Sequence, residues 1–431
     1  MDMTAILASA IFLITFIGIV IERVHKTILV LLGGTFMVIL GVVTQENAFA
    51  YIDLGVIFLL TGLMIIVHFL AESGFFGYVA IRIAQIARGR PIPLAILLCV
   101  ATAGLSALVD NVTTVLLMAP IILLITDRLE VRAIPYLLLT VFASNFGGAA
   151  TLIGDPPNIL IGSASGLSFN AFLIHLAPPA FLAMTMLCGV AVLAIRRESF
   201  VPNDVRARIM QLNAAGAIRD KALMRKTLGV LGAVLVAFML HDVLYLEPAT
   251  VALAGAAILL VIVRADPEQA FKTVEWPTLF FFVGLFMMVA GLSAAGVLEG
   301  LARLGLGFTG DSLFLTSMLV LWFTAFAAAC IGNVPITTAL IPVVYTLIPE
   351  VAGSTEHSME EVRMALWWSL ALGACFGGNM TIYGSAANIV VTDIARANRQ
   401  PVSFLGYFRA SFPVTLAALA IASLYVAWRY I

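Results

Sequence analysis

The sequence predicts an all-α polytopic membrane protein with two inverted repeats of five transmembrane helices, each repeat containing a re-entrant hairpin and a broken helix. Three observations lead to this prediction: an apolar composition, polar interruptions inside apolar segments, and a duplicated set of motifs. Of the 431 residues, 62% are hydrophobic and 11% are charged, and the mean hydropathy is +1.09. Soluble domains carry about 25% charged residues, so this composition indicates a chain that lies largely in a bilayer.

Apolar segments long enough to cross a bilayer recur along the chain. A hydrocarbon core needs about 20 apolar residues per helix. Full spans are expected at 4–21, 28–43, 55–71, 171–195, 227–242, 249–263, 277–293 and 405–428. The first is interpreted as a transmembrane helix and not as a cleaved signal, because it has no positive leading region and no small-residue cleavage site.

Interrupted segments of two kinds lie between the full spans. Short apolar arms joined by a polar tip predict re-entrant hairpins at 92–126 and 312–348. Spans interrupted by helix-breaking sequence predict broken helices at 133–165 and 362–395. In the first of these, FGGAATLIGDPPNIL combines glycines, which allow close backbone approach, with two prolines that end one helix and begin the next.

The two halves carry the same motifs in the same order. DNVTTVLLMAP at 110–120 aligns with GNVPITTALIP at 332–342, and FGGAATLIGDPPNILI at 146–161 aligns with FGGNMTIYGSAANIVV at 376–391. Each half contributes five crossings, so the second copy must be inverted in the membrane. Inverted repeats with broken helices at matching places are the sequence pattern of a secondary transporter.

Loop charges predict the orientation of the chain. With this arrangement 20 of the 23 Lys and Arg residues lie on one side, and only Arg303, Arg363 and Arg429 lie on the other. The positive side is cytoplasmic, so we expect a multi-pass protein of the cell (inner) membrane with both termini extracytoplasmic. The expected domains are a first repeat at 1–195, a cytoplasmic linker at 196–226 and a second repeat at 227–431.

The two hairpin tips and the two helix breaks are expected to converge on one substrate site. Non-helical backbone at membrane depth is tolerated only where it is buried in protein or lines a cavity. The candidate substrate-binding residues are Asn111, Thr113, Thr114, Thr151, Asn158, Asn333, Thr337, Thr338, Thr381, Ser385 and Asn388. Their amides and hydroxyls both donate and accept hydrogen bonds. No Lys or Arg is among them, which favours a small neutral solute over a multiply charged anion, although helix N-termini can also bind an anion.

Two acids of this region occur in the first half alone. Asp110 aligns with Gly332, and Asp155 aligns with Ser385. An acid inside the membrane is costly and is a functional hypothesis by default. Burial disfavours the charged form of a carboxyl group, so such a group can exchange a proton near neutral pH. Proton coupling is therefore assigned to Asp110 or Asp155, with helix capping and coordination of a cation such as Na⁺ as the alternatives.

The motifs DNVTTVLLMAP, GGAATLIGDPPNILIGS, EWPTLFFFVGLF and GGNMTIYGSAANIV resemble the ion transporter superfamily, in particular the branch with ArsB-type arsenite permeases, NhaD-type antiporters and the melanosomal P protein. The resemblance covers nearly the whole chain. It implies a scaffold and a transport domain, with the tips and breaks forming the substrate site. Gly332 departs from the P-protein pattern, which has an acid there, and this weakens a symmetric pair of cation sites.

The expected function is secondary active export of arsenite or antimonite, as a neutral oxyacid, in exchange for protons. A Na⁺/H⁺ antiporter, a dicarboxylate or citrate carrier and a channel-like anion pathway are the alternatives. We expect no enzyme, catalytic residue, resident metal or cofactor, because no nucleotide loop, metal cluster or nucleophile–base pair is visible. The four cysteines are interpreted as packing residues.

The expected partners are a small inorganic substrate, protons and the lipid bilayer, and no nucleic acid. A homodimer and a docked cytoplasmic ATPase subunit are left open.

Overall fold

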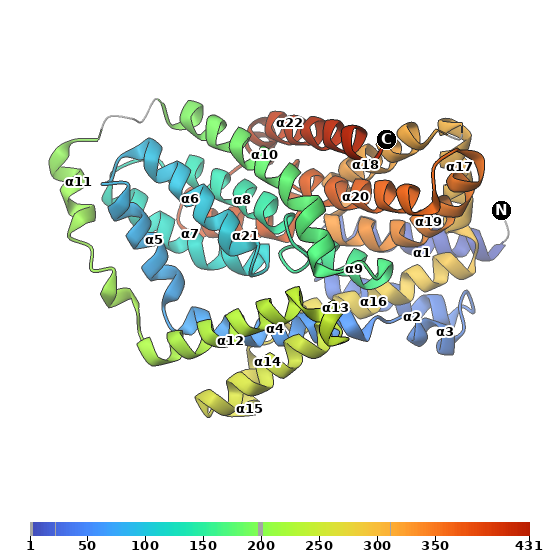
Figure 1. The fold of residues 1–431 in the computed structure, drawn as a ribbon, viewed down its shortest axis with the longest axis horizontal. Helices are drawn as coiled ribbons and strands as arrows, with labels where there is room; N and C mark the ends of the chain where they lie inside the picture. Colours follow the sequence, from blue (N-terminus) through green and yellow to red (C-terminus); the bar gives the residue numbers. More distant parts are fainter. Residues whose placement is uncertain (1–2, 22, 197–200, 311) are drawn as a thin grey trace.

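The helices of the computed structural model run mainly along one direction, which Figure 1 places horizontally. The structure describes residues 3–21, 23–196, 201–310 and 312–431, and these residues form helices and connecting turns without any strand. Eight of the described helices are long and apolar enough to cross a membrane. The all-helical, polytopic membrane fold predicted from the sequence is therefore confirmed.

The first half of the chain contributes ten helices. They are α1 (Met3–Ile21), α2 (Lys26–Ile39), α3 (Gln45–Ala50), α4 (Leu54–Glu72), α5 (Phe75–Ile86), α6 (Pro91–Ser106), α7 (Asn111–Arg128), α8 (Ala133–Gly148), α9 (Pro156–Ser165) and α10 (Phe169–Ile195). Helices α6 and α7 cover the segment predicted as the first hairpin, and α8 and α9 cover the segment predicted as the first broken helix.

The second half follows the connecting helix α11 (Asn203–Met210). Its main helices are α12 (Lys221–Met239), α14 (Pro248–Val263), α15 (Pro267–Lys272), α16 (Trp276–Ala294), α17 (Val297–Thr309), α18 (Leu313–Ile331), α19 (Asn333–Ser354), α20 (Met359–Gly377), α21 (Ala386–Ala397) and α22 (Phe404–Tyr430), with the short α13 (His241–Leu244) after α12. The first residue of each helix from α14 to α19 lies 222 positions after that of its counterpart from α2 to α7, and α21 begins 230 positions after α9.

Two helix crossings connect the halves, and each is made at a glycine. Helix α4 packs on α14, and α16 packs on α2. A Cβ atom on Gly62 would lie 2.6 Å from the carbonyl carbon of Ala252, and one on Gly284 would lie 2.8 Å from the carbonyl carbon of Val30. Small residues let membrane helices approach closely, so these two crossings fasten each half to the other.

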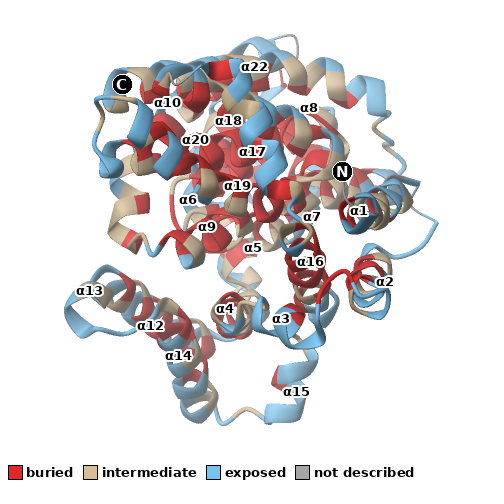
Figure 2. Ribbon diagram, turned by 90° about the vertical axis from the view of Figure 1, so that its right-hand side faces the viewer, coloured by how far each residue is buried: buried red, intermediate tan, exposed pale blue. Residues whose placement is uncertain are grey.

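The helices of the hairpin and broken-helix segments form two groups. In Figure 1, α6, α7 and α8 lie toward one end together with α21, while α18, α19 and α20 lie toward the other end together with α9. The shorter part of each broken helix thus packs among helices of the opposite half. Figure 2 shows that buried residues are concentrated around α8, α9, α18, α19 and α20, and every residue of α20 from Ala365 onward is buried.

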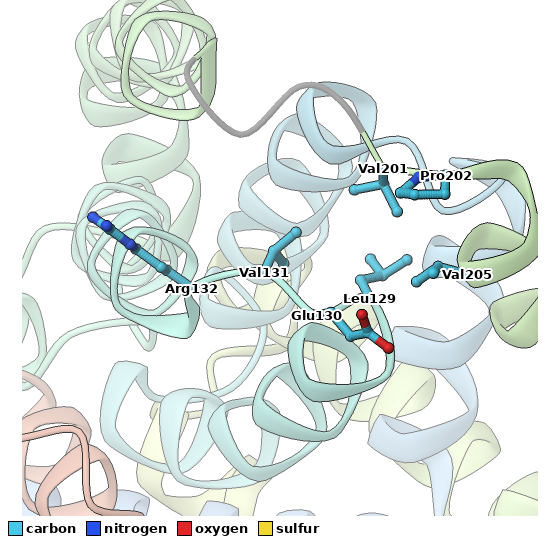
Figure 3. Close-up of a pocket in the computed structure, with 7 residues that line it drawn as sticks. All are labelled: Leu129, Glu130, Val131, Arg132, Val201, Pro202 and Val205. Carbon is cyan, nitrogen blue, oxygen red and sulfur yellow. The ribbon is translucent and has the colours of Figure 1, made fainter.

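The linker between the halves packs across the turns that follow α5 and α7. The Arg208 guanidinium pairs with the Glu130 carboxylate at 2.7 Å, and Nε2 of Gln85 donates to the carbonyl of Leu212 at 2.8 Å. A cavity of about 280 Å³ is lined by residues 129–132 and by Val201, Pro202 and Val205 of the linker, which are drawn in Figure 3. Residues 197–200 of the predicted linker lie outside the described residues. Helix α1 and the C-terminus lie toward the end of the molecule opposite α11 (Figure 1).

Candidate functional site

Each helix break contains an asparagine whose side-chain amide donates hydrogen bonds to two backbone carbonyls of that break. Nδ2 of Asn158 donates to the carbonyls of Ala149 (3.1 Å) and Thr151 (2.8 Å). Nδ2 of Asn388, which is 230 positions later, donates to the carbonyls of Gly378 (2.7 Å) and Thr381 (2.8 Å). A helix end leaves backbone carbonyls without partners, and burying them unpaired is costly. Asn158 and Asn388 therefore hold the breaks in shape.

The threonines of the breaks fasten each break to its neighbouring hairpin. Oγ1 of Thr151 donates to the carbonyl of Ala107 at 2.6 Å and accepts from the amide of Gly154 at 3.1 Å. Oγ1 of Thr381 likewise donates to the carbonyl of Ala329 and accepts from the Gly384 amide. Each hairpin tip is thus held against the adjacent break.

Asp110 caps helix α7, since its Oδ1 accepts from the amide of Thr113 at 2.8 Å. The matching residue Gly332 has a φ of +93° and places no side chain over α19. Such a φ favours glycine. Asp110 therefore makes the helix-capping contact that was one of the alternatives left open by the sequence.

Asp155 lies at the N-terminus of α9 but makes no capping hydrogen bond. Its carboxyl group is completely buried and accepts from Nδ2 of Asn333 at 3.2 Å, across the boundary between the halves. The second oxygen of the same carboxyl group lies 3.5 Å from this Nδ2. The hydrogen-bond partner of Asp155 is thus an uncharged amide from the opposite half.

Asn145, in the middle of α8, is a site residue that sequence reasoning missed. Its Oδ1 accepts from Nδ2 of Asn111 (3.0 Å) and from Oγ of Ser385 (3.3 Å). Its Nδ2 donates to Oδ1 of Asn379 (2.8 Å) and to Oδ1 of Asn388 (3.0 Å). The four bonds use the full capacity of one amide group. Asn379 was also missed.

The repeat relates these contacts in pairs. Position 145 corresponds to Cys375, 230 positions later. The thiol of Cys375 donates to Oδ1 of Asn158 at 3.5 Å, as Asn145 donates to Asn388. Asp155 beside Cys375 likewise corresponds to Ser385 beside Asn145. The site therefore has two clusters: an acid cluster (Asp155, Asn158, Asn333, Cys375) and an amide cluster (Asn111, Asn145, Asn379, Ser385, Asn388).

The side chains of three other candidate residues make no hydrogen bond to a side chain of either cluster in this conformation. The hydroxyls of Thr337 and Thr338 donate to the carbonyls of Asn333 and Val334 on their own helix. The hydroxyl of Thr114 is buried and has no hydrogen-bond partner among the described residues. Thr113 contributes its backbone amide to the cap described above.

Helix ends of both polarities meet at the site. The N-termini are those of α7, α9, α19 and α21, and the C-termini are those of α6, α8, α18 and α20. The N-terminus of a helix carries partial positive charge and the C-terminus carries partial negative charge. Four ends of each kind largely offset one another, so the backbone alone does not make this a strongly cationic site.

The site is closed to solvent in this conformation. Asn111, Asn145, Asp155 and Asn388 are each at most 1% exposed. Two surface cavities, of about 280 and 550 Å³, lie away from these residues, one at the linker and one at a loop region lined by His68, Asp220 and Arg264.

The far end of α9 is fastened by three polar contacts. Oγ of Ser163 donates to the Asp53 carboxylate, which also caps α4 through the Val56 amide. The hydroxyl of Tyr345 donates to the carbonyl of Ala164, and the guanidinium of Arg363 donates to the carbonyl of Ser165. These side chains come from α19, α20 and the residue that precedes α4.

Comparison with known proteins gives consistent results. A family model described as a citrate transporter (CitMHS) matches residues 16–373. An uncharacterized transporter of Mycobacterium tuberculosis is 41% identical over 99% of both chains, and a 46 kDa membrane protein of Mycobacterium leprae is 42% identical over 99% of both. The mouse P protein is 30% identical over 95% of this chain and 58% of its own length.

The fold also matches a solved transporter. The crystal structure of the Alcanivorax borkumensis YdaH transporter aligns with a TM-score of 0.62 and 15% identity, and covers 89% of this chain and 86% of that chain. At this identity the match concerns the fold alone. The family match and the P-protein relative confirm the resemblance predicted from the motifs, and the chain belongs to the citrate transporter family of membrane transporters within the ion transporter superfamily.

Proposed function

We propose that the chain is a secondary active carrier that exports a small neutral oxyacid of the arsenite or antimonite class in exchange for protons. The observation that carries this proposal is the buried carboxyl group of Asp155, whose hydrogen-bond partner is the uncharged amide of Asn333. A carboxyl group without a cationic partner is stable in its neutral form when buried. Binding and release of one proton at Asp155 would then accompany the change of access.

The chemistry of the amide cluster supports a neutral substrate. Its members offer amide and hydroxyl groups, and the helix ends around them offset one another in charge. A tricarboxylate such as citrate would bring several negative charges close to Asp155. Without a guanidinium or ammonium partner for them, that arrangement is unfavourable.

A second candidate is Na⁺/H⁺ antiport. The observation in its favour is Oδ1 of Asn111, a buried acceptor without a hydrogen-bond partner among the described residues, on the residue that follows Asp110 in the chain. Carboxylate and amide oxygens are suitable ligands for hard cations.

The proposal includes an arrangement in the membrane. The face that carries α11 is cytoplasmic, both termini are extracytoplasmic, and the two repeats are inverted relative to each other. Helices α6 to α9 and α18 to α21 move against a scaffold that contains the α4–α14 and α2–α16 crossings. The charge bias of the loops and the constant offset between equivalent helices support this arrangement.

The test is transport in proteoliposomes that contain the purified protein. Uptake of arsenite, antimonite, citrate and Na⁺ is measured with an imposed pH gradient of either sign and without a gradient. We expect arsenite or antimonite to accumulate only against a proton gradient of the correct sign. Accumulation of citrate or Na⁺ alone would contradict the proposal and select the corresponding alternative.

A further inference from the structure

We infer that the amide cluster is the subsite that recognises hydroxyl groups of a neutral substrate, with Asn379 and Asn111 as the groups in contact with substrate and Asn145 as the residue that positions them. This inference rests on the proposed function and names a chemical basis for its selectivity. Neither Asn145 nor Asn379 was singled out by the sequence.

The first step of the argument is the orientation of three amides. Oδ1 of Asn145 accepts from Nδ2 of Asn111, and Nδ2 of Asn145 donates to Oδ1 of Asn379. The Asn145 amide is itself fixed by Asn388, whose Nδ2 is held by two backbone carbonyls. Because each bond dictates which atom is donor and which is acceptor, the three amides have one consistent orientation.

The second step is what this orientation leaves unpaired. Nδ2 of Asn379 is a donor and Oδ1 of Asn111 is an acceptor, and neither has a hydrogen-bond partner among the described residues. Asn379 is fully buried and Asn111 is 1% exposed. Leaving a buried polar group without a hydrogen bond costs about 1–3 kcal/mol of stability. Two such groups, both on residues bonded to the Asn145 amide, therefore point to a ligand that pairs with them.

The third step is the chemical class of that ligand. A hydroxyl group donates and accepts, so a solute with two or more hydroxyls can satisfy both Asn379 and Asn111. A carboxylate or a fully deprotonated oxyanion offers acceptors only. It would pair with Asn379 but leave the Asn111 oxygen facing another lone pair. The subsite therefore favours a small hydroxylated solute over a carboxylate or a fully deprotonated oxyanion.

The fourth step is the divergence between the repeats. Asn145 and Asn379 correspond to Cys375 and Ala149, while Ser385 corresponds to Asp155. The amide cluster thus has the uncharged residues, and the acid cluster has the ionisable ones. One cluster recognises the substrate while the other binds the proton, although both are built on the same backbone plan.

The test is equilibrium binding to the purified protein in detergent. The probes are arsenous acid and boric acid, both neutral and hydroxylated at pH 7, with phosphate and citrate as charged probes. We compare the wild type with Asn379→Leu, which keeps a similar side-chain volume and removes the free donor. A second variant is Asn379→Ala, because Ala149 occupies the matching point of the first break and shows that this backbone accepts alanine. The matched control is Asn398→Ala, at the exposed C-terminal end of α21.

We expect both Asn379 variants to bind a neutral probe roughly tenfold more weakly, which corresponds to one lost hydrogen bond. Their preference for neutral over charged probes should fall as well, a change that a general loss of structure would not produce. Unchanged affinity and preference in both variants would overturn the inference, as would failure of the wild type to bind either neutral probe.

Failure of the inference is distinguishable from failure of the proposed function. If the wild type binds the neutral probes and the variants do not, but no proton-coupled transport occurs, the inference holds and the proposed function is wrong. If proton-coupled transport of arsenite occurs and the Asn379 variants match the wild type in binding, the proposed function holds and the inference is wrong.

Discussion

Asp155 accepts a hydrogen bond from Nδ2 of Asn333 at 3.2 Å, although 178 positions separate the two residues. Asp155 belongs to the break of the first half, and Asn333 is the first residue after the hairpin tip of the second half. Neither half alone can form the site. Any movement of one half's hairpin against the other half's break must change the surroundings of this carboxyl group.

Replacing Asp155 by Asn is expected to abolish accumulation driven by a pH gradient while substrate counterflow persists. Asn is close to Asp in size and still makes hydrogen bonds, but it cannot carry an exchangeable proton. The measurement is arsenite flux in proteoliposomes, with an imposed pH gradient and, separately, in counterflow without one.

The matched control for this variant is Asp110→Asn. Asparagine is as good an N-cap as aspartate, so the cap on α7 is kept and pH-driven accumulation should stay close to that of the wild type. Full accumulation in Asp155→Asn would exclude a proton-carrying role for that residue. Loss in Asp110→Asn alone would assign the role to Asp110.

Asn388→Ala and Asn158→Ala are expected to lower stability. Each removes an amide that satisfies two buried carbonyls, and an unsatisfied buried group costs about 1–3 kcal/mol. The measurement is the apparent thermal unfolding midpoint in detergent, with Asn398→Ala as the control because its amide bonds to a carbonyl at an exposed helix end. If both variants unfold at the wild-type temperature, these asparagines do not hold the breaks together.

Gly62→Ala and Gly284→Ala are expected to destabilise the scaffold by about 1–3 kcal/mol, because the new methyl group would overlap the backbone of the crossing helix. Gly229→Ala in α12 is the control. A Cβ at Gly229 meets nothing within 4 Å, and Gly→Ala at an unstrained position stabilises by about 0.4–1 kcal/mol. In a thermal unfolding measurement, Gly62→Ala and Gly284→Ala should therefore have lower midpoints than the wild type. Gly229→Ala should have a midpoint equal to or above that of the wild type.

The proposed orientation predicts opposite labelling of two exposed positions. Met210→Cys, in α11, should react with a membrane-impermeant thiol reagent only after cells are opened, whereas Glu356→Cys should react in intact cells. Cys188 and Cys330 are replaced first, and Cys99 and Cys375 are buried. Labelling of position 210 from outside intact cells would contradict the proposal that α11 is cytoplasmic.

The positions of the interruptions could be predicted from the sequence because their signals are local. Glycines and the adjacent prolines Pro156 and Pro157 cannot continue a helix without cost, and α8 does end at Gly148 and α9 does begin at Pro156. The internal repeat then located the second break, where proline is absent and glycine alone marks the interruption.

The centre of the site could not be predicted because it depends on tertiary contacts. Asn145 lies inside a regular helix with no breaker beside it, and the matching residue in the second half is Cys375, so the repeat gave no indication. The polar pair Ser144–Asn145 in an otherwise apolar segment was the only available signal. Composition likewise could not distinguish the two acids, since one caps a helix and the other faces the opposite half.

The bond between Ser163 and Asp53 at the end of α9 is not repeated by the corresponding residues of the second half. Those residues are Asp393 and Glu275, two acids, and Asp393 pairs with Arg396 of its own helix at 3.2 Å. Under the alternating access proposed above, this bond would stabilise the access state in which it is formed, and bound solute would have to supply differential binding energy to reverse that preference.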